Sequence, residues 1–276
     1  MTTTQQGFTL IELSIVLVII GLIIGGVLVG QEMIAAAQGR AQISQIEKYN
    51  TAVNTFQTKY GGIPGDLNIT LAAQFGFVTL GCAAVGARDG NGLIDGLPGG
   101  HPLIQAVGET GLFWQDLSTA GFLDTTIPNN GAAQVLGGGA SPVLSSTTIG
   151  QYLPSAKIGG GNFLYVYEVN GMNWYGLSTV TSINSSGQLF SNTQISVTQA
   201  YNLDKKIDDG MPTTGIVQAV YINGGYLAGA TSIPPSGSPD TASTCYNNST
   251  NTYSNNVNKG SGPNCALSFK MQGQAR

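Results

Sequence analysis

Hydrophobic and polar positions divide the chain into a long N-terminal helix and a larger part of mixed pattern. The apolar stretch from Phe8 to Gly30 contains a single charged residue, Glu12. Beyond Gln31 the pattern becomes amphipathic, because apolar residues recur three or four positions apart and so line one helical face. These residues are Ile46, Tyr49, Val53, Phe56 and Tyr60. We therefore predict one continuous helix from Phe8 to Tyr60, about 80 Å long at 1.5 Å per residue.

The end of this helix carries a strong local signal. Gly61 and Gly62 follow Tyr60, and Pro64 comes shortly afterwards. Glycine just past the last periodic residue, with proline beyond it, is typical of a helix C-terminus. Pro64 and Gly65 also suit the second and third positions of a type II turn.

Three roles compete for the apolar stretch. A cleaved secretory signal has basic residues before an apolar core of roughly 7 to 15 residues, whereas this leader has no Lys or Arg and the apolar run is longer. A buried core helix rarely shows the ~20 consecutive apolar residues that a bilayer requires. A membrane-spanning helix fits best. Glu12 then needs a partner, because an ionised side chain at the bilayer centre costs roughly 2.5 kcal/mol or more.

The charged residues on either side of the apolar stretch predict how the helix is oriented in the membrane. Arg40, Lys48 and Lys59 follow it, while the leader before it has no positive side chain. The positive-inside rule, taken alone, places the C-terminal side in the cytoplasm.

Beyond residue 61 the periodicity alternates between strand and helix, which predicts an α+β head built on an antiparallel sheet. Asn170-Gly171 lies between two β-rich runs and is the strongest short signal for a hairpin. Phe113, Trp114 and Leu117 recur at helical spacing, and we expect this aromatic face in the core. The predicted strands are 162–169, 172–180 and 215–222. The predicted short helices are 109–121 and one that begins at Val197 and is ended by Gly210-Met-Pro212.

Composition suits an exported domain rich in strands and loops. Only 9% of residues are charged, 42% are hydrophobic and the net charge is −4. Nucleic-acid binding requires clustered Lys and Arg, and the largest basic cluster is Lys205-Lys206. His101 is the one histidine, and the sequence has no nucleophile elbow, phosphate-binding loop or zinc-site spacing. We expect no catalytic residues and no enzyme activity, since a tethered carbohydrate-active enzyme would need paired carboxylates in one cleft.

The run from Arg88 to Gly96 fits two interpretations. Asp89, Asn91 and Asp95 occupy the first, third and seventh places of a calcium loop, but Leu93 takes the fifth place and Gly100 the place of the bidentate Glu. Ordinary turn chemistry is the preferred interpretation, and calcium is the one cofactor left open. For the acidic residues near the end of the second short helix, we expect a solvated helix end. These are Asp204, Asp208 and Asp209.

The sequence Gly7-Phe8-Thr-Leu-Ile-Glu12, followed by about twenty apolar residues, resembles the processing site of type IV prepilins and pseudopilins. This resemblance implies that a prepilin peptidase cleaves after Gly7 and methylates the new amino group of Phe8. It implies that Glu12 pairs with the Phe amine of a neighbouring subunit. It also implies that the globular part faces away from the cytoplasm, against the charge rule.

The resemblance divides the chain into a leader, 1–7, a hydrophobic and then amphipathic helix, 8–60, and a globular head, 61–276. The segments around Tyr60 to Asp66 and around Asp204 to Pro212 are similar to segments of a subgroup of these proteins, and some pseudopilins bind calcium in their heads.

The three cysteines are Cys82, Cys245 and Cys265. A loop closed by Cys245 and Cys265 is similar to the C-terminal disulfide-bounded loop of type IV pilins, and Cys82 stays an alternative partner for either. In an oxidising compartment such a loop stabilises a domain by about 3 kcal/mol in the chain-entropy model.

These features predict a structural subunit of a type IV pilus-like filament that polymerises through its N-terminal helix. Alternatives are a minor pilin, a type II secretion pseudopilin, or a surface binding or adhesin domain that is anchored and never polymerises. The expected partners are further copies of the chain, other pilin-like subunits, prepilin peptidase and the inner-membrane assembly machinery. The expected locations are the bacterial inner membrane for the precursor and an extracellular or periplasm-spanning filament afterwards.

Overall fold

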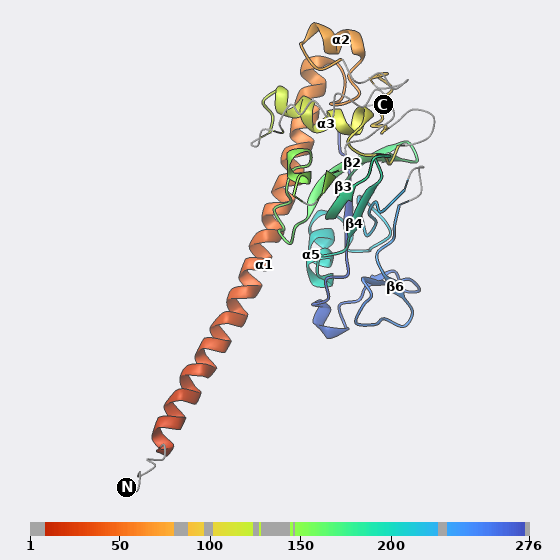
Figure 1. Ribbon diagram of the computed structural model, residues 1–276. Coiled ribbons are helices and arrows are strands. Elements are labelled where there is room, and N and C mark those ends of the chain that lie inside the picture. Colours follow the sequence, from red (N-terminus) through yellow and green to blue (C-terminus); the bar gives the residue numbers. More distant parts are fainter. Residues whose placement is uncertain are drawn as a thin grey trace.

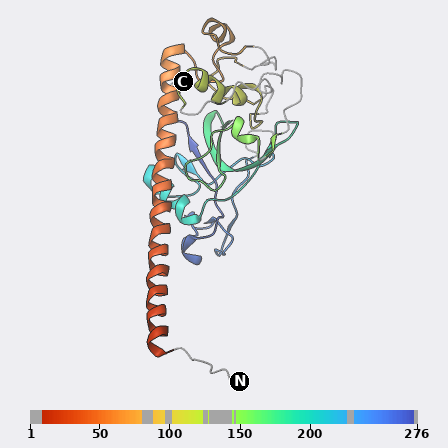
Figure 2. The ribbon, with the colours of Figure 1, turned by 60° about the vertical axis from the view of Figure 1, so that its left-hand side comes forward.

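A computed structural model describes residues 9–79, 88–96, 102–123, 127, 144–145, 147–225 and 231–273. A long helix, α1, runs along one side of a globular head and extends well beyond it toward the N-terminus (Figures 1 and 2). The helices are α1 (Leu10–Tyr60), α2 (Ile69–Gln74), α3 (Gly108–Thr119) and α5 (Val197–Ile207), with 3-10 turns η2 (Ile149–Gln151) and η3 (Asn258–Gly260). The strands are β1 (Leu144–Ser145), β2 (Phe163–Val169), β3 (Met172–Ile183), β4 (Leu189–Asn192), β5 (Val217–Gln218), β6 (Ser236–Gly237), β7 (Tyr246–Asn247), β8 (Thr252–Tyr253) and β9 (Leu267–Lys270). The predicted α+β class, with a long helix and an antiparallel sheet, is confirmed.

Helix α1 changes character along its 51 residues. Its first half is exposed on all sides in the isolated chain, with Leu22 72% exposed. Its second half buries one face in the head, where Val53 and Phe56 are almost fully buried. The helix ends at Tyr60, because Gly61 adopts the left-handed conformation (φ 82°) and donates its N–H to the carbonyl of Gln57. The apolar periodicity therefore predicted both the helix and its buried face correctly.

Strand β3 is the centre of the main sheet and pairs antiparallel with β1, β2, β4 and β9, while β5 pairs with the outer edge of β9. Asn170 and Gly171 join β2 to β3 with φ values of 55° and 73°, which are the values of a type I′ turn. The predicted hairpin is confirmed, and β3 continues to Ile183, beyond the predicted end.

Aromatic side chains fasten α1 to the sheet and to α3. The rings of Tyr49 and Trp114 meet edge-on with centroids 4.9 Å apart, and Tyr175 of β3 lies 6.2 Å from Trp114. Phe113 and Leu117 are completely buried beside them. The aromatic face of α3 is therefore core, as predicted.

One prediction for the C-terminal part was wrong in extent. The strand expected at 215–222 is only Val217–Gln218, because Ala219 N–H turns back to the carbonyl of Pro212 and takes the chain off the sheet edge. In the polar segment between β5 and β9, strands β6, β7 and β8 form a separate small sheet, at the lower right of the head in Figure 1.

Candidate functional site

The N-terminal end of α1 places Glu12 in a capping box. The backbone N–H and the hydroxyl of Thr9 both donate to Glu12 Oε2 at 2.8 Å, and the Glu12 N–H donates to Thr9 Oγ1 at 3.4 Å. Thr9-Leu-Ile-Glu12 has the Thr-x-x-Glu spacing that signals such a box before an apolar run, a signal missed in the sequence analysis. Within the described residues, Oε1 of Glu12 accepts no hydrogen bond, so one carboxylate oxygen stays available. Gly7 and Phe8, the predicted cleavage and methylation positions, lie outside the described residues.

The helix that follows is long and apolar enough to cross a membrane, and none of its most apolar window is buried in the head. Exposed leucine, isoleucine and valine side chains surround it from Leu10 to Ile34. In water such a surface is strongly unfavourable, since each large apolar side chain left exposed forgoes about 1.5–3 kcal/mol of burial. Lipid or other helices must therefore cover this half.

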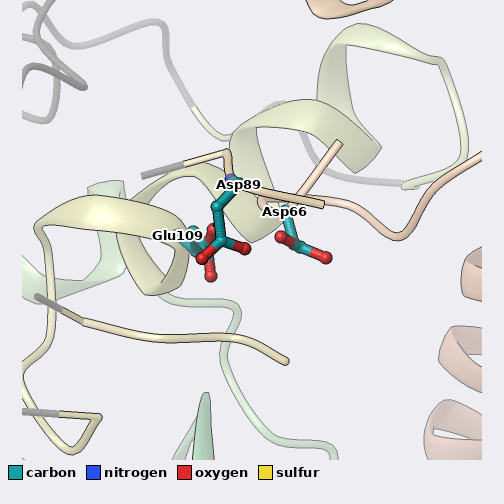
Figure 3. Close-up of side chains that lie close together, drawn as sticks. All are labelled: Asp66, Asp89 and Glu109. Carbon is teal, nitrogen blue, oxygen red and sulfur yellow. The ribbon is translucent and has the colours of Figure 1, made fainter. Parts of the chain in front are cut away.

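A second candidate site lies in the head, where three carboxylates converge (Figure 3). Oxygens of Asp66, Asp89 and Glu109 lie within 4.8 Å of one another, and Asp66 and Glu109 are buried. Gly65 sets this arrangement: its φ is +86°, and a Cβ there would lie 2.4 Å from the Glu109 carbonyl oxygen. Only glycine lets the loop carrying Asp66 approach α3 this closely.

Backbone donors hold the buried pair in place. Gly90 and Gly92 N–H groups donate to Asp66 at 2.8 and 2.7 Å, and Arg88 and Asp95 N–H groups donate to Glu109 at 2.8 and 2.9 Å. Burial raises the pKa of both carboxyls, and the negative charge of Asp66 raises that of Glu109 further. Oxygens of the two buried side chains lie within 4.8 Å of each other, and this proximity favours one proton on the pair. Chemically, the cluster can retain that proton or hold a cation.

Asp89 and Asn91 behave mainly as turn residues. Asp89 Oδ1 accepts the Asn91 N–H at 2.9 Å, and Asn91 Oδ1 accepts the Leu93 N–H at 2.7 Å, the bonds of Asx turns. Calcium binding by these residues stays a prediction. Asp66 and Glu109 were not predicted as companions of Asp89, since no local pattern links positions so far apart in the chain.

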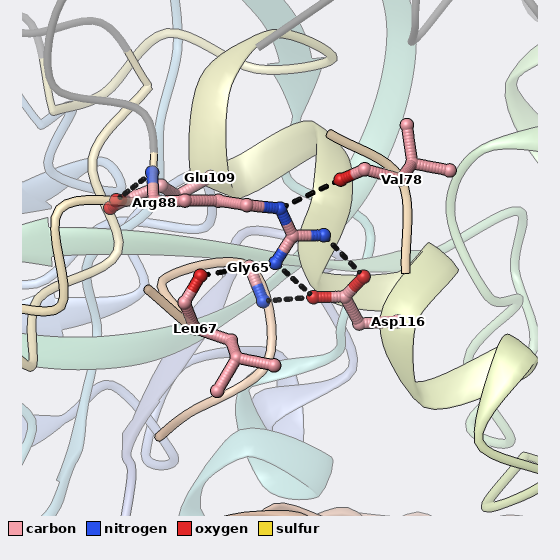
Figure 4. A network of polar contacts seen from close by, with 6 residues as sticks. All are labelled: Gly65, Leu67, Val78, Arg88, Glu109 and Asp116. Carbon is pink, nitrogen blue, oxygen red and sulfur yellow. Dashed lines mark hydrogen bonds and ion pairs between the residues drawn. The ribbon is translucent and has the colours of Figure 1, made fainter. Parts of the chain in front are cut away.

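A buried ion pair lies next to the carboxylate cluster (Figure 4). The Arg88 guanidinium donates to both carboxylate oxygens of Asp116, at 2.9 and 2.7 Å, and neither side chain is exposed. Asp116 Oδ2 also accepts the Gly65 N–H at 2.8 Å, and Arg88 Nε donates to the Val78 carbonyl at 2.9 Å. The pair thereby joins the turn before α2, the segment around Arg88 and α3.

Asp204 at the end of α5 corrects another prediction. It is completely buried, not solvated, because its two oxygens accept the Tyr253 hydroxyl at 2.8 Å and the Gly210 N–H at 3.0 Å. Asp208 is half-buried and Asp209 is exposed. The expectation of a solvated helix end holds for Asp209 and is wrong for Asp204.

Cys245 and Cys265 are joined by a disulfide bond, and both are buried. The bond closes a loop of sequence separation 20 that contains β7 and β8. Cys82 and His101 lie outside the described residues.

The N-terminal segment matches a known family model. Residues 2–28 match the family model described as a prokaryotic N-terminal methylation motif. Searches of curated proteins and of solved structures gave no significant match. The segment is the prepilin-type signal of type IV pilins and pseudopilins, which confirms the resemblance found in the sequence.

The motif and the exposed apolar helix together define a precursor that is anchored in a membrane by its N-terminal helix. More particularly, the chain carries the N-terminal processing motif of type IV pilin-like and pseudopilin precursors. The motif implies processing by prepilin peptidase and assembly with pilin-like subunits.

Proposed function

We propose that the chain is the structural subunit of a type IV pilus-like filament, cleaved after Gly7 and polymerised through α1. The observation that carries this proposal is the exposed apolar half of α1 with a carboxylate at its start. A plain membrane anchor needs no such carboxylate, because the charge only adds to the cost of insertion. An assembling helix needs it when a cationic partner arrives with the next subunit.

Cleavage supplies that partner. The new α-amine of Phe8 is protonated near neutral pH, and Glu12 lies one helical turn beyond it. In the precursor the capping box already satisfies Oε2, while Oε1 is open within the described residues. An ammonium group from a neighbouring subunit can therefore pair with Glu12 without displacing Thr9. A buried polar contact of this kind fixes register between helices.

Substitution of Glu12 tests the proposal. In Glu12→Val we expect normal processing, with Phe8 first and methylated by mass spectrometry, and loss of filaments sheared from cells. Glu12→Asp is the matched control for charge and should retain part of the assembly. An intact Met1 in the mature protein would contradict the processing step, and filaments of normal yield from Glu12→Val would contradict the role of the carboxylate.

A second candidate function is supported by a cleft at the end of the head remote from the N-terminus. The cleft has a volume of about 1170 Å³, and its lining includes Gln57 and Gly61 of the α1 end, Asp66, Asp89 and Lys270. Such a cleft suits a surface binding or adhesin domain. This alternative replaces the filament proposal if the chain stays in the membrane fraction and is absent from every sheared filament of wild-type cells.

The composition of sheared filaments and the effect of deleting the chain on export separate the remaining alternatives. A major subunit dominates the filament mass, whereas a minor pilin is present in few copies. A secretion pseudopilin leaves surface filaments intact when deleted and stops export instead. We propose no enzymatic activity for the chain, since its sequence offers a single histidine and no catalytic motif.

A further inference from the structure

Helix α5 lies beside α1 at the base of the head (Figure 1). Residues of both helices line a groove. Its volume is about 340 Å³. On the α1 side the lining is made of small residues, Ala35, Ala36 and Gly39. Small residues on a helix let a second helix approach closely, so the α1 side of the groove suits helix packing.

The groove continues directly into the uncovered apolar surface of α1. Met33 and Ile34, next to the groove, are 69% and 59% exposed. A Cβ built on Gly39 meets nothing within 4 Å. The head itself therefore leaves this face of the helix open at Gly39, next to the exposed apolar surface.

Two charged side chains in the groove favour a second copy of α1 as its occupant. Glu32 of α1 and Lys206 of α5 both line it. Among the residues that the structure describes, neither side chain has an ion pair or a hydrogen bond. The groove thus presents one carboxylate, Glu32, and one ammonium group, Lys206, without partners. If α1 of a second copy lies in the groove, its own Glu32 can reach Lys206 of the first copy. An acyl chain offers no charge to either residue.

We propose that the α1–α5 groove receives α1 of a second copy of this chain, with Lys206 of one copy paired to Glu32 of the next. The contact joins two different surfaces, so it is heterologous and repeats without closing, as a filament requires. The proposal rests on the proposed function, and it adds the face of the head that holds the neighbouring helix.

Charge reversal in the full chain, in cells that assemble it, tests the pairing. We expect Glu32→Lys and Lys206→Glu each to lower the filament fraction about ten-fold or more, since facing like charges oppose association strongly. The double reversal should restore it. Glu47→Lys and Lys205→Glu are matched controls outside the groove and should assemble normally. Normal assembly of both single reversals, or no rescue by the double, would overturn the proposal.

Two further variants keep the test independent of charge. Gly39→Leu fills the groove where the chain leaves open space, so we expect normal unfolding of the head and loss of filaments; normal filaments would overturn the proposal. Two differently tagged copies, one with Glu32→Cys and the other with Lys206→Cys, should form a disulfide carrying both tags, unlike a Glu47→Cys and Lys206→Cys pair. If filaments form in normal yield without the doubly tagged disulfide product, the proposed contact in the groove is wrong. If wild-type cells yield no filaments, the proposed function itself is wrong.

Discussion

Replacement of Asp116 by alanine should destabilise the head severely, because it leaves the Arg88 guanidinium buried without its counter-ion. The substitution removes two charge-assisted hydrogen bonds to Arg88 and the bond from the Gly65 N–H. Removing one partner of a buried ion pair typically costs about 3–5 kcal/mol. Since domains are stable by only about 5–15 kcal/mol in total, we expect Asp116→Ala to lose a large part of the free energy of unfolding.

The assay can report on the head alone. The two tryptophans, Trp114 and Trp174, are both buried in the head, so intrinsic fluorescence follows its unfolding without interference from the exposed half of α1. Denaturant titration of the full chain in detergent micelles gives the free energy. Glu47→Ala, an exposed position on α1, is the control and should change it by less than about 0.5 kcal/mol.

The double variant Arg88→Met/Asp116→Leu decides the physical reason. If the cost of Asp116→Ala is an uncompensated buried charge, two apolar side chains of similar size should recover most of the lost stability. A loss below about 1 kcal/mol in Asp116→Ala, or a double variant as unstable as the single, would refute this reasoning.

Two further predictions concern the C-terminal half. Burial raises the pKa of Asp204 from 3.8 to about 6, so the folded state binds this proton more tightly than the unfolded chain does. The free energy of unfolding should therefore fall as the pH rises from 4 through 6. Asp204→Asn should lack that fall in denaturant titrations at each pH, and an unchanged fall would exclude Asp204 as its cause. Reduction of the Cys245–Cys265 disulfide, or Cys245→Ser with Cys265→Ser, should lower the free energy of unfolding by about 3 kcal/mol for a loop of this length, and equal stability with and without reductant would contradict it.

Features with a local signal were predictable from the sequence. The end of α1 follows from Gly61, and the hairpin follows from Asn170-Gly171, since each depends on the backbone freedom of a few adjacent residues. The buried face of α1 follows from a period repeated over several turns, as Val53 and Phe56 show.

Features that depend on contacts between distant segments were not predictable in the same way. Asp66 and Glu109 meet because Gly65 lets a turn approach α3, and nothing near either residue in the sequence announces the other. Asp204 was expected in solvent because two lysines follow it, yet Tyr253 of β8 covers it. Helical periodicity places Asp204 correctly on α5, but it does not indicate that β8 packs against this end of the helix.

Helix α1 is largely exposed before Gln42 and is part of the head after it. Gln42 is the first residue of α1 buried in the head, and its Oε1 accepts the Ile158 N–H at 3.1 Å, while Gln45 Oε1 accepts the Lys157 N–H at 3.0 Å. Beyond these contacts Val53 and Phe56 belong to the core. Tension applied to the exposed half of α1 would therefore reach the head through a helix whose other half belongs to the core, so pulling that half away from the head would expose Val53 and Phe56.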